Sequence, residues 1–129
     1  MNRIFTIIFL LVISTAYGQG SWTTLSAPAA TRYDDIYFIN EQVGWTAGGW
    51  LKKVHKTTDG GETWNESGTF TKYLRSIEFM DSNIGLCGSL DSSLYRTTDG
   101  GETWEDVALT ITPRPKGVCG LAKADENTI

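Results

Sequence analysis

The chain has 129 residues, with 15 acidic side chains against 11 basic ones and a formal net charge of −4. This balance argues against general binding of nucleic acids or anionic membranes, because both require basic surfaces. Two cysteines and one histidine are too few for a structural zinc site. We therefore expect no metal and no cofactor.

The first 18 residues have the pattern of an export signal. A short basic start precedes an apolar run over residues 4–13, and the small residues Ala16 and Gly18 fit a cleavage site. The run is shorter than the ~20 residues that span a membrane. We expect cleavage before Gln19 and a mature protein in the periplasm or outside the cell, without stable membrane insertion.

Downstream, short strands and polar turns alternate, and no helical periodicity is evident. Ile36 and Phe38, like Ile77 and Phe79, alternate with polar residues as in a half-buried strand. In chain order, the further strands expected are residues 43–47 and 54–57, one opening at Trp64, then 84–88, 94–97 and one opening at Trp104. Each unit thus has four strands.

The strongest signal is an internal repeat. The octapeptide at residues 57–64 recurs without change at 97–104, an offset of 40 residues. A weaker third copy of the unit begins at residue 120. A period of about 40–50 residues is typical of propeller blades. We therefore predict an all-β fold of four-stranded antiparallel β-propeller blades. The units are residues 22–64, 65–104 and an incomplete 105–129.

About two and a half such blades form an open arc, whereas propellers close with about four to eight. We expect the ring to be completed by missing blades of a longer protein or by oligomerisation. Residues 22–25 align with the strands that open at Trp64 and Trp104. They resemble a lone outer strand that belongs to the last blade.

The repeated octapeptide has the chemistry of a turn. Its aspartate can accept backbone N–H groups, its glycines allow positive φ, and its tryptophan buries apolar area. The structural residues expected are Thr57, Asp59, Gly61, Thr63, Trp64, Thr97, Asp99, Gly101, Thr103 and Trp104. The alternative is that the aspartates are catalytic acids or calcium ligands, but calcium sites gather more oxygen ligands than one such loop supplies.

A second group of residues lies just before the first strand of each unit. It comprises Arg32, Tyr33, Lys72, Tyr73 and Arg75. If the loops that carry them converge at one face, they form an aromatic and basic rim suited to an acidic peptide. The alternative is a set of exposed loop residues without a common ligand. Cys87 and Cys119 likewise leave two possibilities, a disulfide or two buried free thiols.

Both octapeptides match the Asp-box, or bacterial neuraminidase repeat, at every fixed position. The longer unit adds Phe38, Gly44-Trp45 and Gly48 before the first box, and Phe79, Gly85 and Gly88 before the second. This unit most closely resembles the photosystem II stability and assembly factor family, over residues 22–129. The resemblance implies an exported, non-catalytic propeller scaffold that binds a protein partner.

The alternative is a sialidase-type or other Asp-box glycoside hydrolase. Such an enzyme needs an arginine cluster for a substrate carboxylate and an activated nucleophile. The mature arginines are Arg32, Arg75, Arg96 and Arg114. Arg32-Tyr33-Asp34 lacks the Arg-x-Pro start common in sialidases, and catalytic residues would have to lie in a missing C-terminal part. We expect no catalytic residue in this chain.

Overall fold

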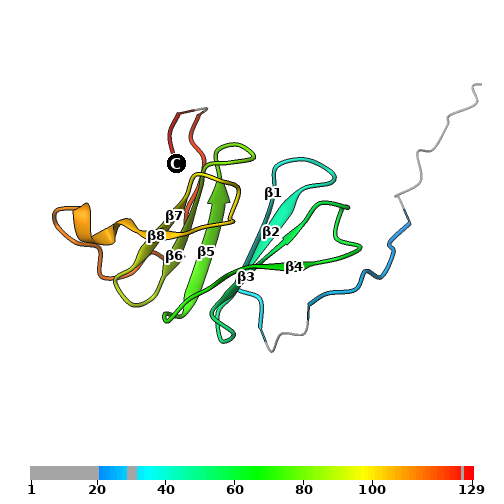
Figure 1. Ribbon diagram of the computed structural model, residues 1–129, viewed down its shortest axis with the longest axis horizontal. Coiled ribbons are helices and arrows are strands. Elements are labelled where there is room, and N and C mark those ends of the chain that lie inside the picture. Colours follow the sequence, from blue (N-terminus) through cyan, green and yellow to red (C-terminus); the bar gives the residue numbers. More distant parts are fainter. Residues whose placement is uncertain (1–20, 29–31, 126) are drawn as a thin grey trace, which may run out of the picture.

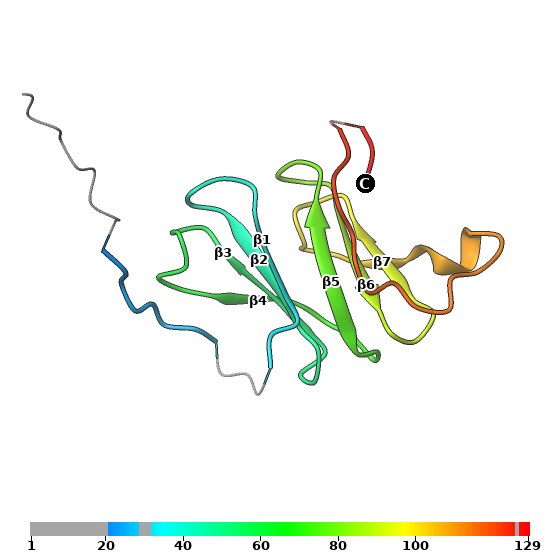
Figure 2. The ribbon, with the colours of Figure 1, turned by 180° about the vertical axis from the view of Figure 1, so that it is seen from behind.

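The computed structural model describes residues 21–28, 32–125 and 127–129, which form two separate four-stranded antiparallel sheets (Figures 1 and 2). The first contains β1 (Asp35–Phe38), β2 (Gly44–Gly48), β3 (Lys53–Thr57) and β4 (Asn65–Thr69). The second contains β5 (Leu74–Phe79), β6 (Gly85–Ser89), β7 (Leu94–Thr97) and β8 (Glu105–Asp106), followed by the short 3₁₀ helix η1 (Val107–Thr110). Within each sheet, each strand pairs with the next along the chain, as in a propeller blade.

The all-β prediction is confirmed. No helix among the described residues is long and apolar enough to cross a membrane. The predicted signal, residues 1–18, lies outside the described residues. β4 begins directly after Trp64 and pairs with β3, so the first sheet extends to Thr69, beyond the unit boundary placed at Trp64.

The core lies between the two sheets. Trp45 of β2 stacks on Phe79 of β5, with 3.6 Å between ring centroids and 10° between ring planes. Both side chains are fully buried, and they lie in a cluster with Ala47, Val54, Leu74, Ile77, Cys87 and Tyr95. The two sheets are therefore joined as neighbouring blades, side by side in Figure 1.

The first strands of the two sheets differ in burial. Ile77 is 1% exposed, whereas its counterpart Ile36 is 56% exposed. Phe79 and Phe38 differ in the same direction. The reason is position: β5 faces the first sheet, but the corresponding face of the first sheet has no other sheet against it among the described residues. We call this the open face; it carries Ile36, Phe38, Thr46, His55 and Trp64.

The C-terminal segment repeats one turn of the two sheets. The same backbone bond closes a turn three times, from Ile39 to Val43, from Met80 to Ile84 and from Ala124 to Thr128, at 3.0, 2.8 and 2.9 Å. Within each turn, a side-chain oxygen of Asn40, Asp81 or Asp125 accepts a backbone N–H two residues later. The segment lies against the second sheet, where Lys123 donates to the Met80 carbonyl (Figure 2).

Replacing Trp45 with alanine should destabilise the protein by about 3–5 kcal/mol, because the change leaves a cavity between the sheets. The matched control is Trp50→Ala, since Trp50 is 68% exposed; its expected effect is within about 0.5 kcal/mol. Chemical denaturation monitored by circular dichroism gives both values. Equal losses in the two variants would contradict the assigned core.

Candidate functional site

The two Asp-box turns have the same geometry. In the first, the Thr57 hydroxyl donates to Asp59 at 2.8 Å, and the Thr63 amide donates to the same carboxylate at 2.9 Å. The second box repeats both distances. The glycine φ angles are 74° and 93° in the first box and 73° and 94° in the second. Glycine adopts this left-handed backbone without strain, which explains why both boxes contain two consecutive glycines.

These hydrogen bonds determine the protonation state of the two aspartates. Donation from the Thr63 hydroxyl and amide, and from Thr57, lowers the pKa of Asp59 to about 2. The equivalent bonds lower the pKa of Asp99 to about 2. Both carboxylates are thus held as anions by their own turn, which suits a structural acceptor and not a general acid.

Because both pKa values fall from 3.8 to about 2 on folding, the carboxylates stabilise the folded state above pH ~4 and lose this effect as the pH falls through ~2. The melting temperature should therefore drop between pH 5 and pH 2, and the drop should be smaller in the Asp59→Asn/Asp99→Asn variant. Circular dichroism melts at both pH values measure this.

The control variant is Glu62→Gln/Glu102→Gln, which removes two exposed carboxylates from the same turns. It should keep the full drop in melting temperature. If the aspartate and glutamate variants respond alike, the turn hydrogen bonds do not set the acid sensitivity.

The second box also joins the sheets. The Gly100 carbonyl accepts the Trp45 indole N–H at 3.1 Å and the Lys56 ammonium at 3.0 Å. The Ser67 hydroxyl donates to the neighbouring Gly101 carbonyl at 2.7 Å. Lys56 also lies 5.4 Å from the Trp45 ring centroid, within reach of a cation–π contact. The box is therefore a connection between blades.

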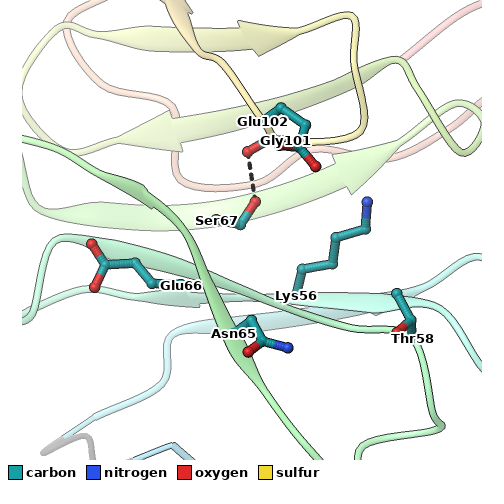
Figure 3. Close-up of a pocket in the computed structure, with 7 residues that line it drawn as sticks. All are labelled: Lys56, Thr58, Asn65, Glu66, Ser67, Gly101 and Glu102. Atoms are coloured by element: carbon teal, nitrogen blue, oxygen red, sulfur yellow. Dashed lines mark hydrogen bonds between the residues drawn. The ribbon is translucent and has the colours of Figure 1, made fainter.

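A polar cleft of about 280 Å³ lies between the first sheet and the second Asp-box (Figure 3). It is lined by Lys56, Thr58, Asn65, Glu66, Ser67, Gly101 and Glu102. Lys56 and Ser67 are already bonded to box carbonyls, and Glu66 pairs with Lys53 at 2.5 Å. No histidine, cysteine or tyrosine lines the cleft. Lys56 and Ser67 therefore connect the two blades here, whereas the pair of Glu66 and Lys53 lies within the first sheet.

The predicted rim has a buried carboxylate at its centre. Arg75 Nη1 lies 2.7 Å from Asp34 Oδ1, and Arg32 Nη2 lies 3.1 Å from the same oxygen. The Tyr73 hydroxyl donates to Asp34 Oδ2 at 2.9 Å. The Asp34 side chain is 0% exposed. We call these four residues the Asp34 cluster. It joins the two blades, because Asp34 precedes β1 whereas Tyr73 and Arg75 lie at the start of β5.

The turn between β2 and β3 completes the site. A Cβ on Gly49 would lie 2.2 Å from Asp34 Oδ2 and 2.4 Å from the Tyr73 ring, so only glycine leaves room for the cluster. The next residue, Trp50, is exposed and meets Tyr73 edge-on at 5.8 Å. An exposed aromatic surface therefore adjoins the two arginines.

The Asp34 cluster carries a net positive charge, because two guanidinium groups surround one carboxylate. Arg32 and Arg75 keep 53% and 37% of their side-chain surface exposed. Burial and the hydrogen bond to Asp34 raise the pKa of Tyr73, which stays a neutral donor. The cluster thus presents fixed cationic donors with unused N–H groups to solvent.

Two predicted rim residues lie apart from the cluster. The Tyr33 hydroxyl donates to the Pro28 carbonyl, and burial raises the pKa of Tyr33. Lys72 makes no hydrogen bond or ion pair with the described residues. Sequence reasoning missed Asp34 and Trp50. A signal for Asp34 was available, since an acidic residue beside Arg32 at the entry to a strand can pair with a cation from the next repeat.

The cysteines form no disulfide in this structure. Cys87 is buried in the core and Cys119 is exposed, so the alternative of two buried thiols holds for Cys87 alone. Burial raises the pKa of the Cys87 thiol, which leaves it protonated. Within the described residues, no three His, Cys, Asp or Glu side chains are grouped as metal ligands.

Replacing Asp34 with alanine should destabilise the protein by about 1–3 kcal/mol, because Tyr73 and Arg75 lose their shared acceptor. Asp91→Ala is the control, since Asp91 is exposed and its carboxylate accepts no hydrogen bond from the described residues. Urea denaturation measures both. A loss no larger for Asp34 than for Asp91 would show that the cluster does not join the blades.

Residues 15–125 match the family described as photosynthesis system II assembly factor YCF48. Comparison with curated proteins finds no match. Among solved structures, the chain is similar to "YCF48 bound to D1 peptide", with a TM-score of 0.55 and 27% identity. That similarity covers 62% of this chain and 27% of the other, so the chain spans about a quarter of that protein's length.

The chain is also similar to an ancestral GH74 enzyme, with a TM-score of 0.55 and 23% identity. This match covers 70% of the chain and 12% of the enzyme, and it shows a likeness of fold alone. The YCF48 match covers most of the chain, and both described sheets have the topology of a blade. The chain therefore belongs to the photosystem II assembly factor YCF48 family, and its sheets are blades of a β-propeller.

Proposed function

We propose that the chain is an exported, non-catalytic scaffold that binds an acidic peptide segment of a partner protein at the Asp34 cluster. One observation carries this proposal: two partly exposed guanidinium groups are fixed on a buried carboxylate, beside the exposed Trp50 and the half-buried Tyr73. Arg32 and Arg75 supply the charge, and Trp50 and Tyr73 supply the aromatic surface.

The chemistry of these groups favours a carboxylate ligand. A guanidinium group offers several donors in one plane and can bind a carboxylate through two hydrogen bonds. Because Asp34 already orders both arginines, little side-chain entropy is lost on binding. Tyrosine, tryptophan and arginine are also the side chains that dominate binding energy at protein interfaces.

The comparisons support a peptide partner. One similar structure is of YCF48 bound to a D1 peptide, and this chain belongs to the same family. The chain spans about a quarter of the length of that protein.

The proposal predicts binding of a fluorescein-labelled peptide with three consecutive glutamates, measured by fluorescence anisotropy at low salt. Arg32→Gln/Arg75→Gln should weaken the affinity about tenfold or more, since each hydrogen bond to a charged group contributes about 1.5–3 kcal/mol. Added salt should weaken binding by screening.

Arg96→Gln/Arg114→Gln is the control with the same change in net charge, at exposed positions away from the cluster. It should retain most of the affinity, and a peptide with glutamines in place of glutamates should not bind. Equal losses in the two double variants would mean that net charge alone attracts the peptide.

A glycoside hydrolase is the alternative function, and the likeness to the GH74 enzyme is compatible with it at the level of fold. Two arginines at the Asp34 cluster could hold a sugar carboxylate. Release of sugar from a glycan panel, abolished by Arg32→Gln/Arg75→Gln, would favour the enzyme over the scaffold. The proposed scaffold releases none.

Export is proposed from the pattern of residues 1–18. Expression of the full chain in a bacterium with a general secretion pathway should place the protein in the periplasm, with Gln19 at its N-terminus. Fractionation followed by N-terminal sequencing measures this. An intact Met1 on cytoplasmic protein would refute export.

A further inference from the structure

The loops at one end of the two sheets are acidic. Because each sheet is antiparallel throughout, its loops fall into two groups, one at each end of the strands. The group that contains both Asp-boxes comprises residues 39–43, 58–64, 80–84 and 98–104. None of these residues is basic. The acidic residues among them are Glu41, Asp59, Glu62, Asp81, Asp99 and Glu102.

The loops at the opposite end are basic. They comprise residues 32–34, 49–52, 70–73 and 90–93, at the lower end of the sheets in Figure 1. Residues 111–118 return to this end, since Arg114 Nε donates to the Ser92 carbonyl at 3.1 Å. We call these five segments the basic end. Their basic residues are Arg32, Lys52, Lys72, Arg114 and Lys116, and their acidic residues are Asp34, which is buried, and Asp91.

The fold therefore separates charges that alternate along the sequence. The net charge of −4, which argues against membrane binding as an average over the chain, conceals this separation. An anionic surface attracts the basic end and repels the Asp-box end, so the charge distribution alone orients the molecule on such a surface.

The tips of two turns at the basic end are apolar. Trp50, between β2 and β3, is 68% exposed, and Leu90, between β6 and β7, is 44% exposed. Tyr73 connects the two turns, because its ring meets Trp50 edge-on at 5.8 Å and its carbonyl accepts the Leu90 amide at 3.1 Å. Lys52 is exposed in the same turn as Trp50. Apolar tips and ammonium groups thus share one surface.

This combination fits the interface of a lipid bilayer. Tryptophan and tyrosine side chains are enriched at that interface, where the ring meets apolar chains and the polar atom meets water. Lysine and arginine are attracted to anionic headgroups. A soluble polyanion offers the same charge but no apolar phase for Trp50 and Leu90. An acidic peptide at the Asp34 cluster leaves Leu90, Lys52 and Lys116 unused.

We propose that the basic end docks on the surface of an anionic lipid bilayer. Trp50 and Leu90 enter the headgroup layer, and Lys52 and Lys116 contact the lipid phosphates. The Asp-box loops then face away from the bilayer. The contact is peripheral, and it does not depend on the peptide proposal, because the ion pairs of the Asp34 cluster stay in place.

The test is co-sedimentation of residues 19–129, which include every described residue, with lipid vesicles at low salt. Residues 1–18 are left out because their apolar run would enter the vesicles by itself. The protein should bind vesicles of equal parts phosphatidylcholine and phosphatidylglycerol about tenfold or more tightly than pure phosphatidylcholine. Added salt should weaken the binding by screening.

Two double variants locate the charges that matter. Lys52→Gln/Lys116→Gln should weaken binding to the mixed vesicles about tenfold or more, since each basic residue near an anionic surface adds to the affinity. Arg96→Gln/Lys123→Gln makes the same change in net charge at exposed positions outside the basic end. This control should bind like the unaltered chain.

Two tryptophan variants test the apolar tip. Trp50→Ala should weaken binding to the mixed vesicles, because the indole no longer enters the interface. Trp22→Ala removes a side chain that is 98% exposed outside the basic end and should have no effect. Both positions are exposed, so the melting temperatures should stay unchanged.

Three results would overturn the proposal. The first is equal binding to the two kinds of vesicle. The second is an equal loss in the two charge variants, since net charge alone would then attract the protein. The third is an unchanged affinity in Trp50→Ala together with equally tight binding to soluble polyglutamate, because the basic end would then serve a soluble polyanion.

Discussion

The contact between the second Asp-box and the first sheet determines the rest of the structure. The Gly100 carbonyl is fixed by Trp45 and Lys56, and the stacking of Trp45 on Phe79 closes the core beside it. A turn that satisfies itself through its own aspartate leaves its glycine carbonyls free to point outward. The second Asp-box therefore serves as a connector between the two described blades.

The candidate site depends on that contact. Asp34 belongs to the first blade, and Tyr73 and Arg75 belong to the second, so the Asp34 cluster exists only when the two blades are packed. Its chemistry is correspondingly simple, with fixed cations beside an aromatic surface. The proposed binding role is supported by family membership and by this site, whereas the likeness to a glycoside hydrolase extends only to the fold.

Much of the fold could be predicted from the sequence, because strand alternation and turn chemistry are local properties. The repeat placed the strands to within a few residues, and the resemblance to the assembly factor family is confirmed. Burial could not be predicted in the same way. Ile36 and Ile77 have the same local pattern, but only Ile77 has a blade in front of it. Asp34 was missed because two of its partners, Tyr73 and Arg75, lie in the next repeat.

The most direct test of the account is the solvent exchange of indole N–H protons, measured by NMR on the unaltered protein. The Trp45 indole is buried and bonded to the Gly100 carbonyl, whereas Trp22 and Trp50 are exposed. The Trp45 proton should exchange far more slowly than those of Trp22 and Trp50. Exchange at the same rate would mean that the box does not join the blades.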